Sequence, residues 1–545
     1  MLIAVLLSQS APVLIYGSGG PGSVYAGEIP PGSDSKPVIV FVHGKSSSAD
    51  VWYSGNDMYS LAYSWGYRTA FVNLYPEGSM WTNGALLNNL LNVISGYFGT
   101  NNLVVIAHSK GGIDTETAIF HYGNVNVKQV MTLSTPYWGS PLADLAYSTW
   151  LWWLAEILGL TTDATYVLQT GYMAWFRSVT DPIYYLNPIP TYSYSAWFDG
   201  TPFTWPWNDN FCLSAICWGQ WYLSLNGGSC SEGGNDGAVT YSSAHKPTSI
   251  NMSAPCSSSA WKYNHYEIAK GYNVWDRLVF NISVNRNEPG QFDRSPFLTV
   301  GSSYYFARSG ESLNLRGDFY VLVFGADESE RLETTLPHQD MGLKNIPMGD
   351  GIFMKARVYR FENVKAGKYT FSLQRNSRLP IMIAFDGKPA YLSSDRMVYR
   401  YGDVATFTVR LPEGVESVEG VIRNIRSGQE WPLVFSGRGG EYVARFHIPH
   451  QKGVYNISVS ARGDGYYRSM TKSIMVVERN ESRPDLKTMS SSSVPEGRRF
   501  QVFDVSGRKV FEGVAADGMP DLRGLKRGTY IIKFEDSSIR RVIVR

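Results

Sequence analysis

The sequence predicts an α/β fold for the first half of the chain and β-rich domains for the second half. Before position 277, apolar strand-like runs alternate with helical stretches, a pattern typical of a parallel sheet covered by helices on both faces. After about Glu288 the pattern changes to short alternating strands separated by Gly, Pro and Asn. The 545 residues are too many for one core, so we expect several domains.

The strongest motif is the stretch Leu103 to Gly112, which joins a predicted buried strand to a helix through a serine. Its first four residues are apolar and mostly β-branched, as in a strand buried on both faces. Ala107 and Gly111 flank Ser109 two positions away on either side. This small-x-Ser-x-Gly pattern is that of a nucleophile elbow, a turn too tight for large side chains. The motif predicts Ser109 as a nucleophile at the carboxyl end of a strand.

A hydrolytic serine also needs a histidine base and an acid that orients it. In an α/β fold with a nucleophile elbow, the acid and then the histidine follow the serine in the chain. His265 lies in a loop just before a predicted last helix, where this order expects the base. Asp236 lies in a turn between two glycines and leads into an apolar segment. The sequence therefore predicts Asp236 as the acid and His265 as the base.

Other histidines and acids fit these two roles less well. His121 lies on the helix that leaves the elbow and cannot turn back to Ser109, and His245 follows Asp236 too closely for a helix between them. Asp199 and Asp209 are rival acids in the Trp-rich loop before Asp236. Asp236 itself is also compatible with the role of an ordinary turn aspartate.

An earlier strand run ends in His43-Gly44 and is followed by Lys45. In acyl-transfer enzymes the backbone N–H just past such a glycine is well placed to bind an oxyanion. We therefore expect the N–H groups of Lys45 and Lys110 to form an oxyanion hole, and His43 to be a packing residue beneath the loop.

Four motifs in order, Val-His-Gly, Ala-His-Ser-Lys-Gly-Gly, Leu-Ser-Thr-Pro-Tyr-Trp-Gly-Ser-Pro-Leu-Ala-Asp and Asn-Asp-Gly-Ala-Val-Thr, resemble secreted bacterial true lipases of the α/β-hydrolase fold. The resemblance covers about residues 36 to 277 and implies Ser109, Asp236 and His265 as the catalytic triad. It implies no required cofactor. Many such lipases hold a structural calcium through an acid two positions past the histidine. This chain has Glu267 there and no clear second ligand, so calcium is possible and the metal ligands stay unknown.

Aromatic residues crowd the region between the motifs, where the segment at about 145–190 is predicted as a lid. Large apolar patches mark interaction sites more often than not, so a lid or substrate surface is favoured here over plain core. The candidate substrate-contacting residues are Trp138, Trp150, Trp153, Trp175 and Trp197. The same surface would suit extracellular polyester depolymerases, which share this fold.

All four cysteines lie within one loop-rich region. An even number in an exported protein favours two disulfides, for which three pairings are possible. Proximity along the chain favours Cys212–Cys217 and Cys230–Cys256. The second bridge would close the loop that carries Asp236.

Domain boundaries follow from these patterns. Residues 1–35 form a possible truncated signal or N-terminal segment, with Pro12 to Tyr16 alternatively a first strand, and 36–285 form the catalytic domain. Residues 290–387 and 388–478 are expected to form β-sandwiches, the latter resembling bacterial immunoglobulin-like domains. A polar linker at 479–497 precedes residues 498–545, which resemble the C-terminal sorting domain of type IX secretion substrates. That resemblance implies export, to the medium or the cell surface, by the type IX machinery.

The composition limits the remaining function classes. A formal net charge of +2 without a basic cluster gives no reason to expect a nucleic-acid partner, and no apolar run is long enough to span a bilayer. The sequence therefore predicts a secreted serine hydrolase, a lipase or esterase, acting on a hydrophobic ester. The alternatives are a polyester depolymerase acting on polyhydroxyalkanoate or an aromatic polyester such as PET, and, from another class, an adhesion protein built on a catalytically dead hydrolase fold.

Overall fold

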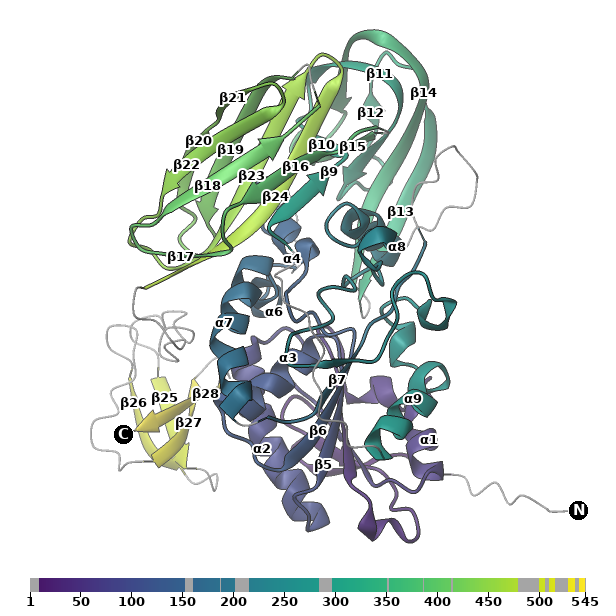
Figure 1. Cartoon of the computed structure of the whole chain (residues 1–545), viewed down its shortest axis with the longest axis vertical. Coiled ribbons are helices and arrows are strands. Elements are labelled where there is room, and N and C mark those ends of the chain that lie inside the picture. The colour runs from purple at the N-terminus through teal and green to yellow at the C-terminus, as the bar shows by residue number, and fades with distance from the viewer. Residues whose placement is uncertain are drawn as a thin grey trace, which may run out of the picture. The chain divides into compact units, whose positions relative to one another are not determined.

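The computed structural model describes residues 9–151, 160–186, 188–200, 215–283, 297–349, 352–385, 387–412, 415–478, 499–504, 509–514, 528–534 and 539–544. The chain divides into two compact units, Met1–Arg479 and Asn480–Arg545. The first unit contains an α/β domain and a β-rich region (Figure 1).

An eight-stranded sheet forms the centre of the α/β domain, in the order β1-β2-β4-β3-β5-β6-β7-β8. Its strands are β1 (Val13–Tyr16), β2 (Val24–Ala26), β3 (Val38–Val42), β4 (Thr69–Val72), β5 (Leu103–His108), β6 (Val127–Leu133), β7 (Thr191–Tyr194) and β8 (Ile250–Asn251). From β4 to β8 the neighbouring strands are parallel, whereas β1 and β2 join the edge in antiparallel pairs. Residues 12–16 therefore contain a first strand, which was the alternative to a signal segment.

Helices cover both faces of this sheet, so its central strands are apolar on both sides. Along β3, Ile39 and Phe41 pack into one core and Val40 into the other, because successive side chains point to opposite faces. The first core is closed by α1 (Met58–Ser64) and α9 (Gly271–Ser283), and the second by α2 (Met80–Phe98). Figure 1 shows α1 and α9 together on one side of the sheet and α2 on the other.

Further helices follow the nucleophile motif and lie between the sheet strands in the chain. They are α3 (Lys110–Glu116), the π-helical turn η3 (Thr117–His121), α4 (Pro141–Ala146), α6 (Asp163–Val167), α7 (Thr170–Leu186) and α8 (Ala215–Ser224). Short 3-10 turns are η1 (Ser33–Ser35), η2 (Ala49–Trp52), η4 (Cys230–Glu232), η5 (Ser259–Trp261) and η6 (Glu267–Ala269). No helix among the described residues is long and apolar enough to cross a membrane.

Residues 304–385 form one six-stranded sheet, not the two-sheet sandwich that we expected there. Its strands are β10 (Tyr304–Ala307), β11 (Glu311–Phe324), β12 (Leu332–Glu333), β13 (Gln339–Gly349), β14 (Ile352–Leu373) and β15 (Ile381–Phe385). Strict alternation gives the sheet two apolar faces: Phe319 and Val321 face the core of this sheet, while Tyr320 and Leu322 face the α/β domain. A sheet apolar on both faces needs a partner on each, and the α/β domain supplies the second.

The following region is a sandwich of two five-stranded sheets around a shared apolar core. One sheet has the order β21-β22-β18-β16-β9 and the other β17-β24-β23-β19-β20. Their strands are β9 (Thr299–Ser302), β16 (Ala390–Ser394), β17 (Val398–Arg400), β18 (Val404–Arg410), β19 (Val415–Asn424), β20 (Glu430–Val434), β21 (Ser436–Arg438), β22 (Glu441–His447), β23 (Gly453–Gly463) and β24 (Tyr466–Val477). Strand β9 belongs to the sandwich but precedes the six-stranded sheet in the chain. The domain boundary expected at 387 therefore does not separate the two regions.

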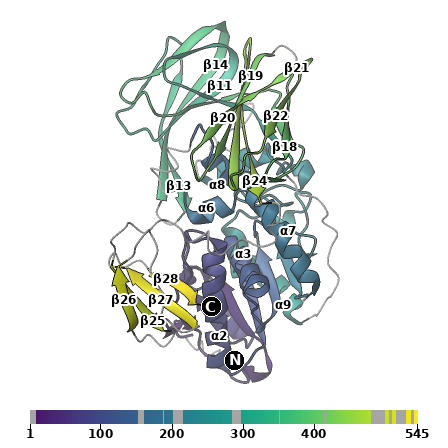
Figure 2. The ribbon, with the colours of Figure 1, turned by 90° about the vertical axis from the view of Figure 1, so that its left-hand side faces the viewer.

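The β-rich region packs closely on the α/β domain through α4 and α7, which both contact β24. Figures 1 and 2 show α7 beside β24. The Gly171 N–H donates to Ser473 Oγ at 2.9 Å, and Ser473 Oγ in turn donates to the buried Asp144 carboxylate at 2.6 Å. A Cβ on Gly171 would lie 2.6 Å from Ile474 Cα. Only glycine therefore permits this approach of helix and strand.

The second unit is described by its backbone alone. It holds a four-stranded antiparallel sheet in the order β26-β25-β27-β28. The strands are β25 (Arg499–Asp504), β26 (Lys509–Val514), β27 (Gly528–Phe534) and β28 (Ile539–Val544).

Candidate active site

Ser109 occupies a tight turn between β5 and α3. Its φ of 53° and ψ of −131° lie in a region that a residue with a side chain rarely adopts. A Cβ on Gly111 would overlap the His43 carbonyl oxygen, which explains the glycine of the motif. The Ser109 N–H donates to the Leu133 carbonyl of β6 at 2.9 Å, so the sheet itself holds the turn.

The structure brings Ser109, His265 and Asp236 together. Ser109 Oγ lies 3.0 Å from His265 Nε2, and His265 Nδ1 lies 2.8 Å from Asp236 Oδ2. Asp236 is fully buried, and only 6% of His265 is exposed. This arrangement allows the imidazole to accept the serine proton while the carboxylate fixes its tautomer.

Several donors hold the Asp236 carboxylate in its ionised form. Burial on its own would raise the pKa of this carboxyl, but His265 and the Val239 N–H outweigh burial and lower its pKa below the usual value. The N–H groups of Ala238 and Val239 donate to Asp236 Oδ1 at 3.0 and 2.8 Å. The acid is therefore ionised at neutral pH and able to stabilise a positive charge on the imidazole.

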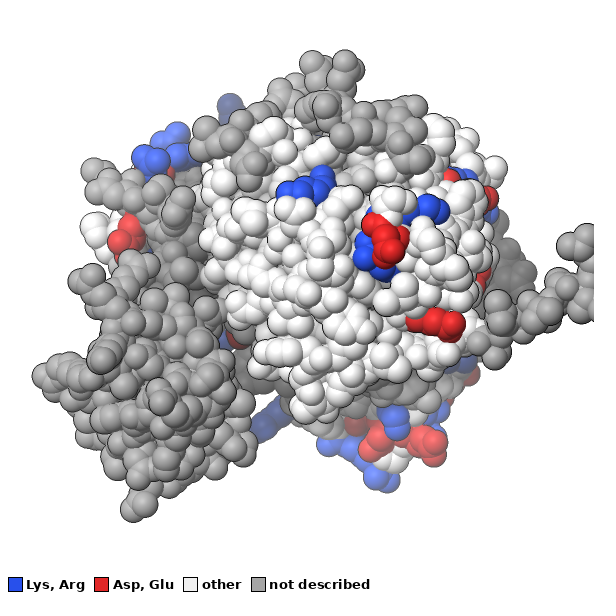
Figure 3. Space-filling view, turned by 90° about the horizontal axis from the view of Figure 1, so that it is seen from below, with Lys and Arg blue, Asp and Glu red and all other residues white. Residues whose placement is uncertain are grey.

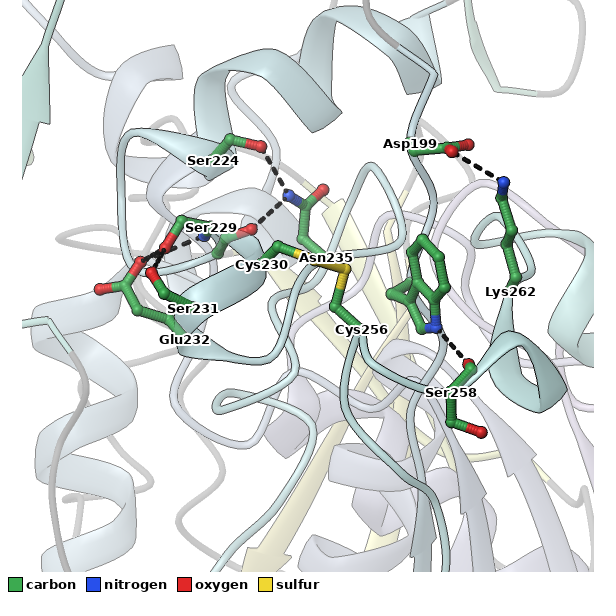
Figure 4. Close-up of a disulfide and its surroundings, with 12 residues drawn as sticks. Asp199, Ser224, Ser229, Cys230, Ser231, Glu232, Asn235, Cys256, Ser258 and Lys262 are labelled. Carbon is green, nitrogen blue, oxygen red and sulfur yellow. Dashed lines mark hydrogen bonds and ion pairs between the residues drawn. A yellow bond between two sulfur atoms is a disulfide. The ribbon is translucent and has the colours of Figure 1, made fainter.

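A disulfide closes the loop that carries Asp236. Cys230 and Cys256 are bonded to each other, as proximity along the chain predicted (Figure 4). Asn235 lies beside this bond and its amide donates to Ser224 Oγ at 3.3 Å. Cys217 is also disulfide-bonded, whereas Cys212, its expected partner, lies outside the described residues.

The loop after β3 lies directly against the nucleophile. A Cβ on Gly44 would lie 2.8 Å from Ser109 Cβ, so the Gly44–Lys45 peptide reaches the serine only because residue 44 is glycine. Among the described residues, no acceptor is found for the N–H of Lys45. Lys110 is the first residue of α3, and the first N–H of a helix has no acceptor within the helix. Both are free to bind an oxyanion. The Lys110 ammonium is paired away from the site with Asp114 at 2.6 Å.

His43 is buried beneath this loop. Its Nδ1 donates to the Gly44 carbonyl at 2.8 Å, and its Nε2 accepts from the Leu74 N–H at 3.0 Å. Burial lowers the pKa of His43 to about 4, so the ring is neutral at physiological pH. Because C=O and N–H point in opposite directions across a trans peptide, the bond to the Gly44 carbonyl turns the Lys45 N–H outward.

Two residues near the site were missed from the sequence. Glu77 accepts from Lys45 Nζ at 3.1 Å and from Thr162 Oγ1 at 2.6 Å, tying the Lys45 loop to the start of α6. His108 Nε2 lies 2.8 Å from the His265 carbonyl oxygen. His108 directly precedes Ser109, a position that could have drawn attention to it, whereas no sequence signal marks Glu77.

The rival histidines and acids lie elsewhere. His121 Nε2 lies 2.9 Å from Thr180 Oγ1, and its ring packs on Trp81. His245 is fully buried, with its Nδ1 2.7 Å from Ser193 Oγ. Asp199 pairs with Lys262 at 2.7 Å, as Figure 4 shows, and Asp209 lies outside the described residues.

The aromatic residues predicted to contact substrate also make packing contacts within the protein. Trp175 is 3% exposed and packs against Tyr172 with ring centroids 5.2 Å apart. Trp138 donates to the His245 carbonyl at 3.0 Å and lies against Phe297 of the β-rich region. Trp175 is therefore a core residue, whereas Trp138 is only half-buried.

The other tryptophans are also occupied. Trp150 stacks on Phe306 of β10 with centroids 6.4 Å apart. Trp197 donates to the Ser258 carbonyl at 2.8 Å and carries Lys262 5.4 Å above its ring. Trp153 lies outside the described residues.

The residue expected to help bind calcium has another partner. Glu267 Oε2 accepts from the Asn264 N–H at 2.9 Å, which holds the turn that carries His265. In the described part of the chain, no group of three or more His, Cys, Asp or Glu residues is placed to hold a metal.

Comparison with known proteins finds similarity to lipases and esterases. Bacillus licheniformis lipase BlEst2 in its propeptide form matches over 84% of this chain and 98% of its own, with 25% identity and a TM-score of 0.59. The mature form of the same lipase matches over 49% of this chain and 100% of its own, with 37% identity and a TM-score of 0.41. Aspergillus fumigatus lipase B matches over 49% of this chain and 57% of its own, with 16% identity and a TM-score of 0.30. No protein-family model matches the chain. A search of curated proteins gives no match either.

The parallel sheet, the turn at its carboxyl edge and the similarity to BlEst2 define an α/β-hydrolase. BlEst2, which matches most of this chain in its propeptide form, is a lipase, and this similarity supports an ester hydrolase activity in general.

Proposed function

We propose that this protein is a serine hydrolase that cleaves carboxylic esters of hydrophobic substrates through an acyl-enzyme. The observation that carries the proposal is the hydrogen-bonded series from Ser109 through His265 to Asp236, with contacts of 3.0 and 2.8 Å. In this reaction Ser109 Oγ attacks the ester carbonyl carbon as His265 Nε2 accepts the serine proton. The N–H groups of Lys45 and Lys110 bind the oxyanion that forms.

The second half of the reaction uses the same residues. His265 returns its proton to the alkoxide as the alcohol leaves, and Ser109 remains acylated. Water then loses a proton to His265 as it attacks the acyl carbonyl, and His265 passes this proton to Ser109 Oγ as the bond from Oγ to the acyl group breaks and the acid leaves. Asp236 stays ionised throughout.

Replacement of the serine tests this proposal. Ser109→Ala is expected to lower kcat for a short-chain ester on the order of a millionfold while the melting temperature changes little. Labelling by a fluorophosphonate probe should be lost in the same variant. Turnover that survives in Ser109→Ala would rule the mechanism out, and a wild-type chain that neither turns over esters nor reacts with the probe would favour the adhesion protein.

The substrate class is the second part of the proposal. A lipase should be activated when a long-chain triglyceride emulsion forms an interface, and a polyester depolymerase should release soluble acids from polyhydroxyalkanoate or PET films. Initial rates on both materials, normalised to the titrated active sites, separate the two.

A specific observation favours a role for the β-rich region as a removable propeptide. BlEst2 matches this chain beyond its α/β domain when it is in its propeptide form. The aromatic face, which we define as Leu142, Leu145, Trp150, Trp218 and Trp221, packs against the six-stranded sheet. Removal of that sheet would expose the aromatic face as the lid-like surface that the sequence suggested.

A protease site inserted between Ser283 and Phe297 tests the propeptide role. Cleavage should raise the rate on emulsified triglyceride relative to that on a soluble short-chain ester. An unchanged ratio after complete cleavage would contradict the role.

Localisation and partners complete the proposal. The resemblance of residues 498–545 to sorting domains supports export by type IX secretion, to the medium or the cell surface. Charged side chains are few and of both signs on the face seen in Figure 3. The proposed partner is a hydrophobic ester, and a net charge of +2 gives no reason to propose a nucleic acid. We propose no required cofactor, and activity that EDTA abolishes would contradict this.

A further inference from the structure

We infer that His108 is a positioning residue that fixes the backbone of the base His265 through a hydrogen bond from its side chain. This inference rests on the proposed triad. It assigns a role to a buried histidine that the reaction scheme does not use.

The first support is the hydrogen-bond geometry. His108 Nε2 lies 2.8 Å from the His265 carbonyl oxygen. A carbonyl oxygen only accepts, so His108 Nε2 carries the proton and donates. The two imidazole rings also pack against each other, with centroids 4.7 Å apart and planes at 45°. His108 therefore contacts both the backbone and the ring of the base.

The second support is where His108 is anchored. It is the last residue of β5 and pairs with Leu133 of β6. The next residue, Ser109, donates its N–H to the Leu133 carbonyl. One dipeptide at the end of a rigid strand thus carries both the nucleophile and the group that holds the base.

The third support is that the backbone of His265 is held on its other side by the acid. The His265 N–H donates to the Asp236 carbonyl at 2.9 Å. The base is therefore fixed between the strand of the nucleophile and the loop of the acid. His265 otherwise lies on a loop 156 residues away from Ser109 in the chain, with no strand of its own to position it.

The charge state of His108 suits this role. Burial, and after it the neighbouring His265, lowers the pKa of His108 to about 3. The ring therefore stays neutral while His265 is transiently protonated during turnover. A second imidazolium 4.7 Å away would oppose that protonation by charge repulsion.

A pair of variants separates positioning from packing. His108→Leu fills the space but has no donor, and His108→Gln keeps an N–H donor at the end of a side chain of similar length. We expect kcat per folded enzyme on a short-chain ester to fall about a hundredfold in His108→Leu, with KM changed less than threefold. In His108→Gln we expect kcat to stay within about fivefold of wild type.

The pH profile is a readout that packing alone would not move. Loss of the hydrogen bond should shift the acidic limb of kcat/KM to lower pH in His108→Leu, because a displaced imidazole binds its proton less tightly beside Asp236. His121→Leu is the matched control, since it removes another packed histidine, at the far end of η3. It should leave both kcat and the pH profile unchanged.

The inference is overturned if His108→Leu turns over like His121→Leu, or if His108→Gln loses as much kcat per folded enzyme as His108→Leu. Should His108→Leu fail to fold, His108→Gln decides: kcat within fivefold supports the role, and a hundredfold loss rejects it. Survival of activity in Ser109→Ala would instead reject the proposed function, so the two failures are distinct.

Discussion

The carboxyl edge of the central sheet and the aromatic face differ in what determines their structure. At the sheet edge, Ser109 and Gly44 are placed by tight turns at the ends of strands, and the residues that constrain them are near in sequence or on adjacent strands. On the aromatic face, Trp150 and Trp218 are buried by strands more than 80 residues further along the chain. The first region can be inferred from a motif, whereas the second depends on a partner that no local pattern reveals.

Among variants that keep the three proposed catalytic side chains, the largest effect should come from crowding the sheet edge. Gly44→Ala would place a Cβ 2.8 Å from Ser109 Cβ and displace the Lys45 N–H from the oxyanion. We expect kcat/KM for a short-chain ester to fall roughly a thousandfold, since loss of one such donor costs two to three orders of magnitude. Gly96→Ala is the matched control, because a Cβ there meets nothing within 4 Å. Normal turnover in Gly44→Ala would mean that this loop does not serve as the oxyanion hole.

If the aromatic segment is core, loss of one of its buried side chains should lower stability and leave activity almost unchanged. Trp175→Ala should lower the free energy of unfolding by about 3 kcal/mol, because it removes a buried ring. Its kcat per folded enzyme should change less than threefold. Chemical denaturation and ester kinetics on the same samples measure both quantities.

The exposed Trp65 provides the control for Trp175, and Trp65→Ala should cost less than about 1 kcal/mol. A Trp175 variant with unchanged stability but a raised KM would restore the interpretation as a substrate surface.

The contact between the α/β domain and the β-rich region should depend on pH. Burial lowers the pKa of Lys472 to about 7, against about 10.4 in the unfolded chain. Between these values the unfolded chain binds more protons, so stability rises with pH. From pH 7 to 9 we expect a gain of about 2 kcal/mol that Lys472→Met lacks. Denaturation curves measure the free energy of unfolding of both proteins at both pH values. An equal change from pH 7 to 9 in wild type and Lys472→Met would refute this prediction.

The smallest effect concerns Glu77, which links the sheet edge to the start of α6. Glu77→Gln keeps an oxygen for Thr162 but loses the charge that pairs with Lys45 at 2.9 Å. Because both side chains are partly exposed, we expect kcat to fall no more than about fivefold and to be less sensitive to salt than in wild type. A loss beyond a hundredfold would give Glu77 a direct part in the chemistry.

These contrasts explain how far the sequence could be interpreted. The small-x-Ser-x-Gly turn, the acid in its glycine-flanked loop and the histidine before the last helix follow rules of local conformation and chain order. The α/β class also follows from the alternation of apolar runs with helical stretches. Those rules sufficed to select Ser109, Asp236 and His265, which the structure brings within hydrogen-bonding distance.

Other features depend on contacts between distant segments. Trp175 looked suited to an exposed lid because composition shows that a segment is apolar but not what covers it. The region at 304–385 looked like a sandwich because alternation defines two faces, and a sequence does not say that the second face packs on a neighbouring domain. Glu77 carries no signal, because its three partners come together only in the folded chain.

The close approach of Gly171 to Ser473 also sets an order of events during synthesis. The two residues are 302 positions apart. At typical elongation rates the ribosome needs about 15 to 60 s to add that length of chain. During this interval α7 has been made, but β24, which packs against it, has not. A nascent chain stalled before β24 should therefore bind hydrophobic dyes and general chaperones, and release them once Val477 has emerged.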